Sequence, residues 1–91
     1  MDWKILIDHI AEPGEQKQAG RGKHSTQDLL DMTYEFQMLD ADDNLYYSGI
    51  CGDVNQANQL EAFEPLDWAA DFAGCTTFKF RKRGTQEWIE L

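Results

Sequence analysis

The densest group of side chains able to do chemistry lies in the stretch LDADDNLYY, where three aspartates and an asparagine fall within five positions. Asp40, Asp42 and Asn44 match the first, third and fifth ligands of a calcium-binding EF-hand loop. Such a loop needs glycine at its sixth position and a bidentate glutamate at its twelfth, but these positions hold Leu45 and Cys51. The spacing therefore argues against a calcium site.

We predict instead that these residues form the turn of a β-hairpin. Asp and Asn side chains accept hydrogen bonds from backbone amides just ahead of them, and both residues tolerate the left-handed backbone conformation. Asp43 or Asn44 is expected to adopt a positive φ. Apolar residues alternate before the turn and a β-like run follows it, which suits two paired strands.

A second group, GRGKHST at residues 20–26, resembles a phosphate-binding P-loop. That motif requires glycine five residues before its Gly-Lys pair, and serine or threonine directly after it. Lys17 and His24 occupy those positions, so the match fails. The segment from Glu12 to Thr26 contains three glycines and no large apolar residue, and it is expected to be a flexible loop.

Two histidines and two cysteines could in principle supply a base and a nucleophile. His9, His24, Cys51 and Cys75 carry no local signature of catalysis, and no Cys-x-x-Cys pair suggests zinc. No secretory signal is evident, so we expect both cysteines to be reduced and to serve as small buried apolar residues. We assign no catalytic, cofactor-binding or metal-ligating residue, and we expect no cofactor.

A row of cations near the end of the chain raises the question of nucleic-acid binding. Lys79, Arg81 and Arg83 alternate with Phe78 and Phe80, so the aromatic rings face away from the cations. Single-stranded nucleic acid needs both on one face, and the net charge of −9 repels phosphate. We therefore predict no nucleic-acid partner and expect cross-strand carboxylates to neutralise the row: Glu35, Glu87 or Glu90.

Charge is distributed unevenly along the 91 residues, which we interpret as a single domain spanning residues 1–91. From Asp28 to Asp71 there are eleven carboxylates and no lysine or arginine. The negative charge of this segment must be solvated, neutralised by the basic ends of the chain, or bound by a cationic partner. No apolar run approaches the length of a membrane span, so we expect no membrane partner and a cytoplasmic location.

The remaining patterns predict an α+β fold with a four- to five-stranded antiparallel sheet, barrel-like in one alternative, and one or two short helices. In the first strand, Trp3, Ile5 and Ile7 are expected to share one face, opposite Asp8. The expected strands are residues 3–10, 28–39, 45–51, 75–83 and 86–91. Helical spacing marks residues 55–63, and Pro65 is expected to start a second helix ending before Gly74.

These segments resemble a pattern in short, uncharacterised bacterial and phage-encoded proteins that have no established activity. The matching pieces are FQMLDADDNLYYSG (36–49), PLDWA (65–69) and AGCTTFKF (73–80), followed by Trp88. Turns of this kind often carry a glycine where this chain has an aspartate or an asparagine. The resemblance implies a bacterial, cytoplasmic protein of mobile-element origin, and it implies no site residue.

The sequence favours a non-enzymatic accessory protein that presents its acidic surface to a basic protein partner. The alternative is a small-ligand-binding or catalytic domain, with Tyr34, Tyr46 or Tyr47, and Trp68 forming a pocket under the loop at 12–26. Whether the chain is a monomer or a homodimer joined through a sheet edge stays open.

Overall fold

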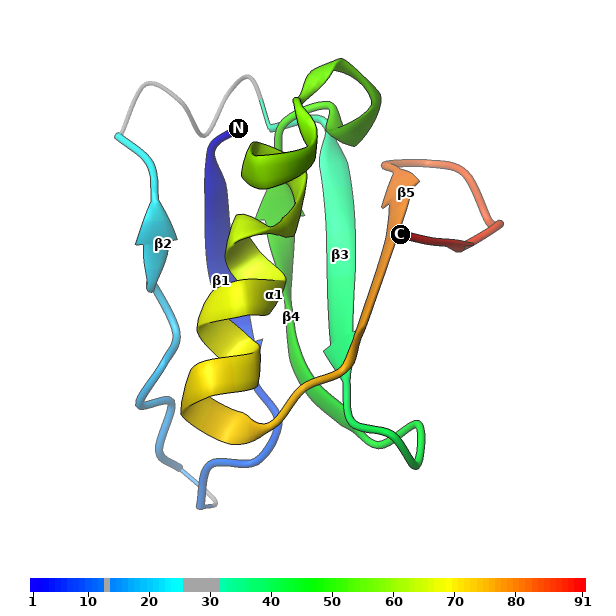
Figure 1. Cartoon of the computed structure of the whole chain (residues 1–91). Helices are drawn as coiled ribbons and strands as arrows, with labels where there is room; N and C mark the ends of the chain where they lie inside the picture. Colours follow the sequence, from blue (N-terminus) through cyan, green and yellow to red (C-terminus); the bar gives the residue numbers. More distant parts are fainter. Residues whose placement is uncertain (13, 26–31) are drawn as a thin grey trace.

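A computed structural model describes residues 1–12, 14–25 and 32–91. Within these residues the fold is an antiparallel sheet that is covered on one face by a single α-helix (Figure 1). The strand order is β2-β1-β4-β3-β5-β6. The strands are β1 (Trp3–Asp8), β2 (Gly22–Lys23), β3 (Tyr34–Leu39), β4 (Leu45–Cys51), β5 (Thr77–Lys82) and β6 (Ile89–Glu90). A 3-10 turn (Val54–Gln56) and α1 (Gln59–Ala73) connect β4 to β5.

The α+β class is confirmed, but the predicted strand number is wrong. Within the described residues the sheet has six strands rather than four or five, because β2 adds to the free edge of β1 through pairs at Trp3 with Lys23 and Lys4 with Gly22. The barrel-like alternative is also wrong, since β2 and β6 end the sheet without pairing to each other. The start of the predicted 28–39 strand, and residues 13 and 26 of the predicted loop, lie outside the described residues.

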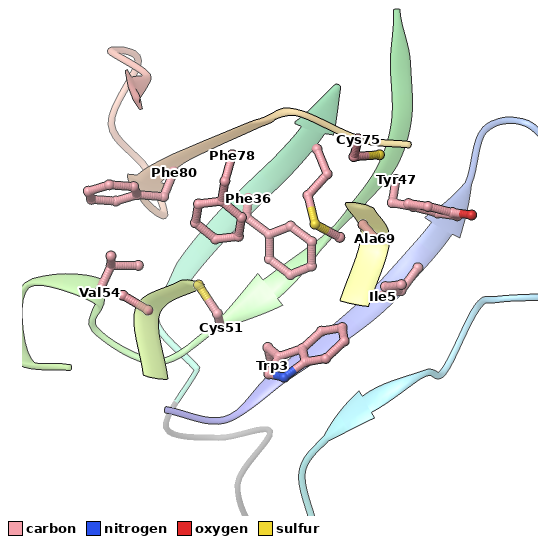
Figure 2. Packing of buried hydrophobic residues seen from close by; sticks show 12 residues of the cluster. Trp3, Ile5, Phe36, Tyr47, Cys51, Val54, Ala69, Cys75, Phe78 and Phe80 are labelled. Atoms are coloured by element: carbon pink, nitrogen blue, oxygen red, sulfur yellow. The ribbon is translucent and has the colours of Figure 1, made fainter. Parts of the chain in front are cut away.

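The core lies between α1 and the sheet, and its side chains follow the predicted alternation (Figure 2). Phe78 and Phe80 point inward as expected, and the ring of Phe36 stacks on Phe78 with centroids 5.4 Å apart. Of the tyrosine pair, Tyr47 is the buried member. Large apolar residues from adjacent strands therefore fill one interior, which is the main source of stability in a domain of this size.

A β-bulge in β1 overturns the predicted facing of its last residues. Ile5 pairs with Gly49 and Ile7 pairs with Ser48, so the register shifts between them and Leu6 is the extra residue. Alternation fails there. Ile7, predicted to share the face of Trp3 and Ile5, is 47% exposed, whereas Asp8, predicted to lie on the opposite face, is only 4% exposed.

One continuous helix replaces the two predicted pieces. Its N-cap is Asn58, whose Oδ1 accepts from the Glu61 backbone N–H at 2.9 Å and whose Nδ2 donates to Glu61 Oε1 at 3.0 Å. Pro65 lies inside the helix and is buried against the sheet. Gly74 lies just past the end of the helix, as predicted, and adopts the left-handed conformation. No helix in the described ranges has the length and apolarity needed to cross a membrane.

Gly49 allows two strands and an aromatic ring to approach each other in the sheet. A Cβ atom at this position would lie 2.0 Å from the backbone oxygen of Lys4 and 2.8 Å from Cζ of Phe36. The space next to the glycine is thus filled by the Phe36 ring from β3 and by the β1 backbone.

Candidate functional site

The aspartate-rich stretch forms the β3–β4 hairpin turn, as predicted. Asp40 Oδ1 accepts from the backbone N–H groups of Asp42 and Asn44, both at 2.9 Å, and its Oδ2 accepts from Asn44 Nδ2 at 3.0 Å. The hydrogen bonds from Asn44 lower the pKa of Asp40. Asp43 adopts φ 62°, one of the two positions expected to do so. The carboxylate of Asp40 thus holds its own turn in shape.

In the described structure, no hydrogen bond joins a histidine to a cysteine of the base-and-nucleophile alternative. His9 Nε2 is 2.9 Å from Ser48 Oγ, and His24 Nε2 is 3.1 Å from the Gly20 carbonyl oxygen. Cys51 and Cys75 are unpaired thiols in the core. Burial raises the pKa of Cys51 to about 12 and that of Cys75 to about 11, which makes both thiols poor nucleophiles.

The sheet face opposite α1 carries the predicted row of cations, and cross-strand carboxylates neutralise part of it. Arg81 pairs with Glu35 on the adjacent strand, and its guanidinium lies 4.3 Å from the ring centroid of Trp88. Lys79 stands opposite Glu90 in the β5–β6 register. Both carboxylates belong to the set predicted for this role.

Three of the four aromatic residues predicted to form a ligand pocket lie together, since Tyr47 contacts both Trp68 and Tyr46, the latter with ring centroids 6.5 Å apart. Tyr34 packs against Phe80, and Tyr46 lies beside Asp40, with which a hydrogen bond raises the pKa of Tyr46. Trp68 packs against Tyr47 with ring centroids 5.4 Å apart. Of these four residues, Tyr47 alone lines a cavity next to the 12–26 segment.

That cavity, of about 330 Å³, lies where the segment after β1 approaches the C-terminal end of α1, and it is called the β1–α1 cavity below. Asp8, Gln18 and Phe72 line it together with Tyr47. Asp8 was predicted to face the other way, so sequence patterns alone did not mark it. The signal is long-range: the β1 bulge turns Asp8 inward.

A stripe of carboxylates on α1 is the other candidate site. Glu64, Asp67 and Asp71 follow a spacing of three and four residues, which places them on one side of the helix, and they are called the α1 acidic stripe below. Asp67 and Asp71 are exposed. No ion pair within the described ranges reaches any of the three. Likewise, no cluster of three or more metal-ligating side chains occurs in the described ranges.

Comparison with family models, curated proteins and solved structures finds no match to this chain. The resemblance to short bacterial and phage-encoded proteins therefore stays a prediction. The α1 acidic stripe and the β1–α1 cavity are the two candidate sites of the molecule.

Proposed function

We propose that the protein is a non-enzymatic accessory protein that binds a basic protein partner through the α1 acidic stripe. The observation that carries this proposal is the charge of α1, which holds four carboxylates and no lysine or arginine over its 15 residues. One of the four, Glu61, pairs with the N-terminal amino group at 3.1 Å. The other three form the stripe, and a partner's cations can reach its exposed members.

The positions of these charges lower the stability of α1 in the unbound protein. Asp71 lies in the last turn of α1, where the helix dipole is negative and an anion destabilises the helix by roughly 0.3–1 kcal/mol. Asp67 and Asp71 are four residues apart, and like charges at that spacing add about 0.2–0.5 kcal/mol of repulsion. No cation occurs in the last turn to offset either effect. A cationic partner would relieve both.

The fold separates this acidic side from part of its own basic charge. Arg81 and Lys79 lie on β5, where they face carboxylates of neighbouring strands across the sheet from α1. The β3–β4 turn, with its three aspartates, lies at the same end of the sheet as the C-terminus of α1 (Figure 1). Charge complementarity of this kind accelerates encounter and selects among partners.

The test compares two doubly neutralised variants that have the same net charge. Asp67→Asn/Asp71→Asn removes two charges from the α1 acidic stripe, and Glu87→Gln/Glu90→Gln removes two exposed carboxylates near the chain end. Each exposed pair contributes ~0.2–1 kcal/mol, so the stripe variant should bind a lysine-rich peptide roughly 2- to 30-fold more weakly. The control should bind as the unmodified protein does.

Binding is measured by fluorescence anisotropy of the labelled peptide at ~0.15 M and at ~1 M ionic strength. We expect binding at the lower salt concentration and its loss at the higher one. Equal weakening in the two variants would show that only net charge matters and would refute the assigned surface. Absence of binding at both salt concentrations would refute the proposed function.

A further inference from the structure

Two residues that line the β1–α1 cavity carry buried polar atoms without a hydrogen-bond partner in the described ranges. The hydroxyl of Tyr47 and Oε1 of Gln18 are buried and make no hydrogen bond within the described ranges. Tyr47 itself has no exposed surface. In Figure 2 its hydroxyl points away from the other labelled core side chains. Buried polar atoms normally have a partner, and Tyr47 and Gln18 both belong to residues that line this cavity, so the two oxygens can receive a ligand's N–H groups after a small side-chain adjustment.

A buried negative charge lies beside these atoms. Asp8 is 4% exposed, and each of its carboxylate oxygens accepts one backbone hydrogen bond, from Ile10 N and from Gln18 N, both at 3.2 Å. No cation pairs with it in the described ranges. A carboxylate in this setting has spare lone pairs and favours a positively charged neighbour. Lys17 also lines the cavity, but it is 68% exposed and its Nζ pairs with Glu15 at 3.4 Å.

The segment that carries Gln18 is fixed over the cavity by hydrogen bonds to β1. The backbone N–H of Asp8 donates to Gln16 Oε1 at 2.9 Å, and Gln16 Nε2 donates to the Asp8 carbonyl oxygen at 3.1 Å. The backbone N–H of His9 donates to the Tyr46 carbonyl oxygen at 2.9 Å. The polar end of the cavity is therefore held in place before any ligand arrives, which reduces the entropy cost of binding.

The remaining wall combines the apolar residues Ile10 and Phe72 with the charged residues Glu12 and Lys17, and it is partly open to solvent. Phe72 is 58% exposed and stacks on Trp68 with ring centroids 5.2 Å apart, and Ile10 is 51% exposed. Both line the cavity, whose volume of about 330 Å³ suits a small molecule. A ligand that fits must combine a short apolar chain with a compact positive group that donates several hydrogen bonds.

We propose that the β1–α1 cavity binds the ammonium end of a small primary amine. The oxygens of Asp8, Gln18 and Tyr47 receive its three N–H groups, and Ile10 and Phe72 cover its carbon chain. Burial, followed by the negative charge of Asp8, raises the pKa of Tyr47 to about 12, so its hydroxyl stays neutral at physiological pH. This site is separate from the α1 acidic stripe, and either can fail without the other.

The experiment is an NMR titration with pentylammonium chloride, against equal concentrations of sodium chloride and against pentanol. Pentanol has the same apolar chain and no charge. We expect pentylammonium to bind with a Kd on the order of 1 mM, and pentanol to bind at least tenfold more weakly. Shifts should centre on the residues that line the cavity. The Asp67→Asn/Asp71→Asn variant should bind the amine as well as the unmodified protein does.

Two variants test the assignment of the cavity. Tyr47→Phe removes only the hydroxyl and should weaken pentylammonium binding roughly 2- to 10-fold, the effect of one hydrogen bond. Phe72→Ala removes the apolar wall and should weaken both probes. Leu60→Ala, which truncates an exposed residue of the same helix outside the cavity lining, is the control and should change neither.

A capped peptide containing one lysine distinguishes the source of the ammonium group. Binding of both the peptide and pentylammonium identifies the lysine side chain of a partner as an accepted ligand, whereas binding of pentylammonium alone restricts the cavity to free amines. Equal binding of pentanol and pentylammonium, or binding of neither, would overturn the proposal.

Discussion

Replacing Tyr47 with phenylalanine should stabilise the protein. The residue is fully buried, and its hydroxyl makes no hydrogen bond within the described ranges. The ring contacts, including the one with Trp68 at 5.4 Å, do not depend on the oxygen atom. Tyr47→Phe therefore removes a desolvated polar group and keeps the packing.

The size of the effect follows from the cost of burying an unpaired hydroxyl, roughly 1–3 kcal/mol in proteins. Loss of the oxygen leaves a small void, which offsets part of this gain. We expect a net increase of about 1 kcal/mol in the free energy of unfolding, or a rise of about 4–8 °C in Tm for a domain of this length.

Urea unfolding followed by tryptophan fluorescence measures this change. The m-value should stay constant, so that the midpoint alone moves. Tyr34→Phe is the matched control: its hydroxyl is on a partly exposed side chain, and the change should stay within about 0.5 kcal/mol. A loss of about 1 kcal/mol in Tyr47→Phe would show that the hydroxyl has a partner, and the argument for an unfilled cavity end would fail.

Three further predictions concern the turn, the sheet and the cysteines. Hydrogen bonds lower the pKa of Asp40 below 3.8, so its contribution to stability is present above that pH and is lost as the pH falls through the lower pKa of the folded state. Urea midpoints between pH 6 and 3 should therefore fall more steeply for the unmodified protein than for Asp40→Asn. Equal slopes would contradict the role of Asp40 in stabilising the turn. Gly49→Ala should destabilise the sheet by roughly 1–3 kcal/mol, because the new Cβ would clash with the Lys4 backbone. Gly52→Ala is the control and should change stability in urea little, because its Cβ would have no neighbour closer than 3.6 Å. Similar losses of stability in both variants would refute the packing argument. Burial raises the pKa of Cys51 to about 12 and that of Cys75 to about 11. With a thiol reagent at pH 8, the folded protein should therefore react more slowly than the protein in urea, roughly a thousandfold at Cys51 and roughly a hundredfold at Cys75. Rapid labelling of the folded chain would contradict this.

Local patterns in the sequence predicted the central strands and the hairpin. Phe78 and Phe80 alternate with cations in the sequence, and in the structure both are buried on the face of the sheet that packs against α1. The position of the turn and the positive φ at Asp43 follow from side-chain chemistry within a few residues. Asn58 and Glu61 also have the spacing of a helix N-cap, and the prediction of two separate helices did not take this into account.

Features set by distant contacts could not be predicted in the same way. β2 is two residues long and is defined by backbone pairing with β1, so it leaves no hydrophobic pattern. Pro65 suggested a helix start, but the buried ring sits within a helix whose cap lies earlier. The cavity joins Asp8, Gln18 and Phe72 from three segments, and no local spacing connects them.

The extra residue in β1 decides which side chain enters the interior, because it shifts the pairing with β4 by one position. Removing the one codon for Leu6 would close the bulge and leave Ile7 opposite Ser48 and Asp8 opposite Tyr47, so Asp8 would still face the interior. A single in-frame deletion would thus regularise the strand and keep the acid inside.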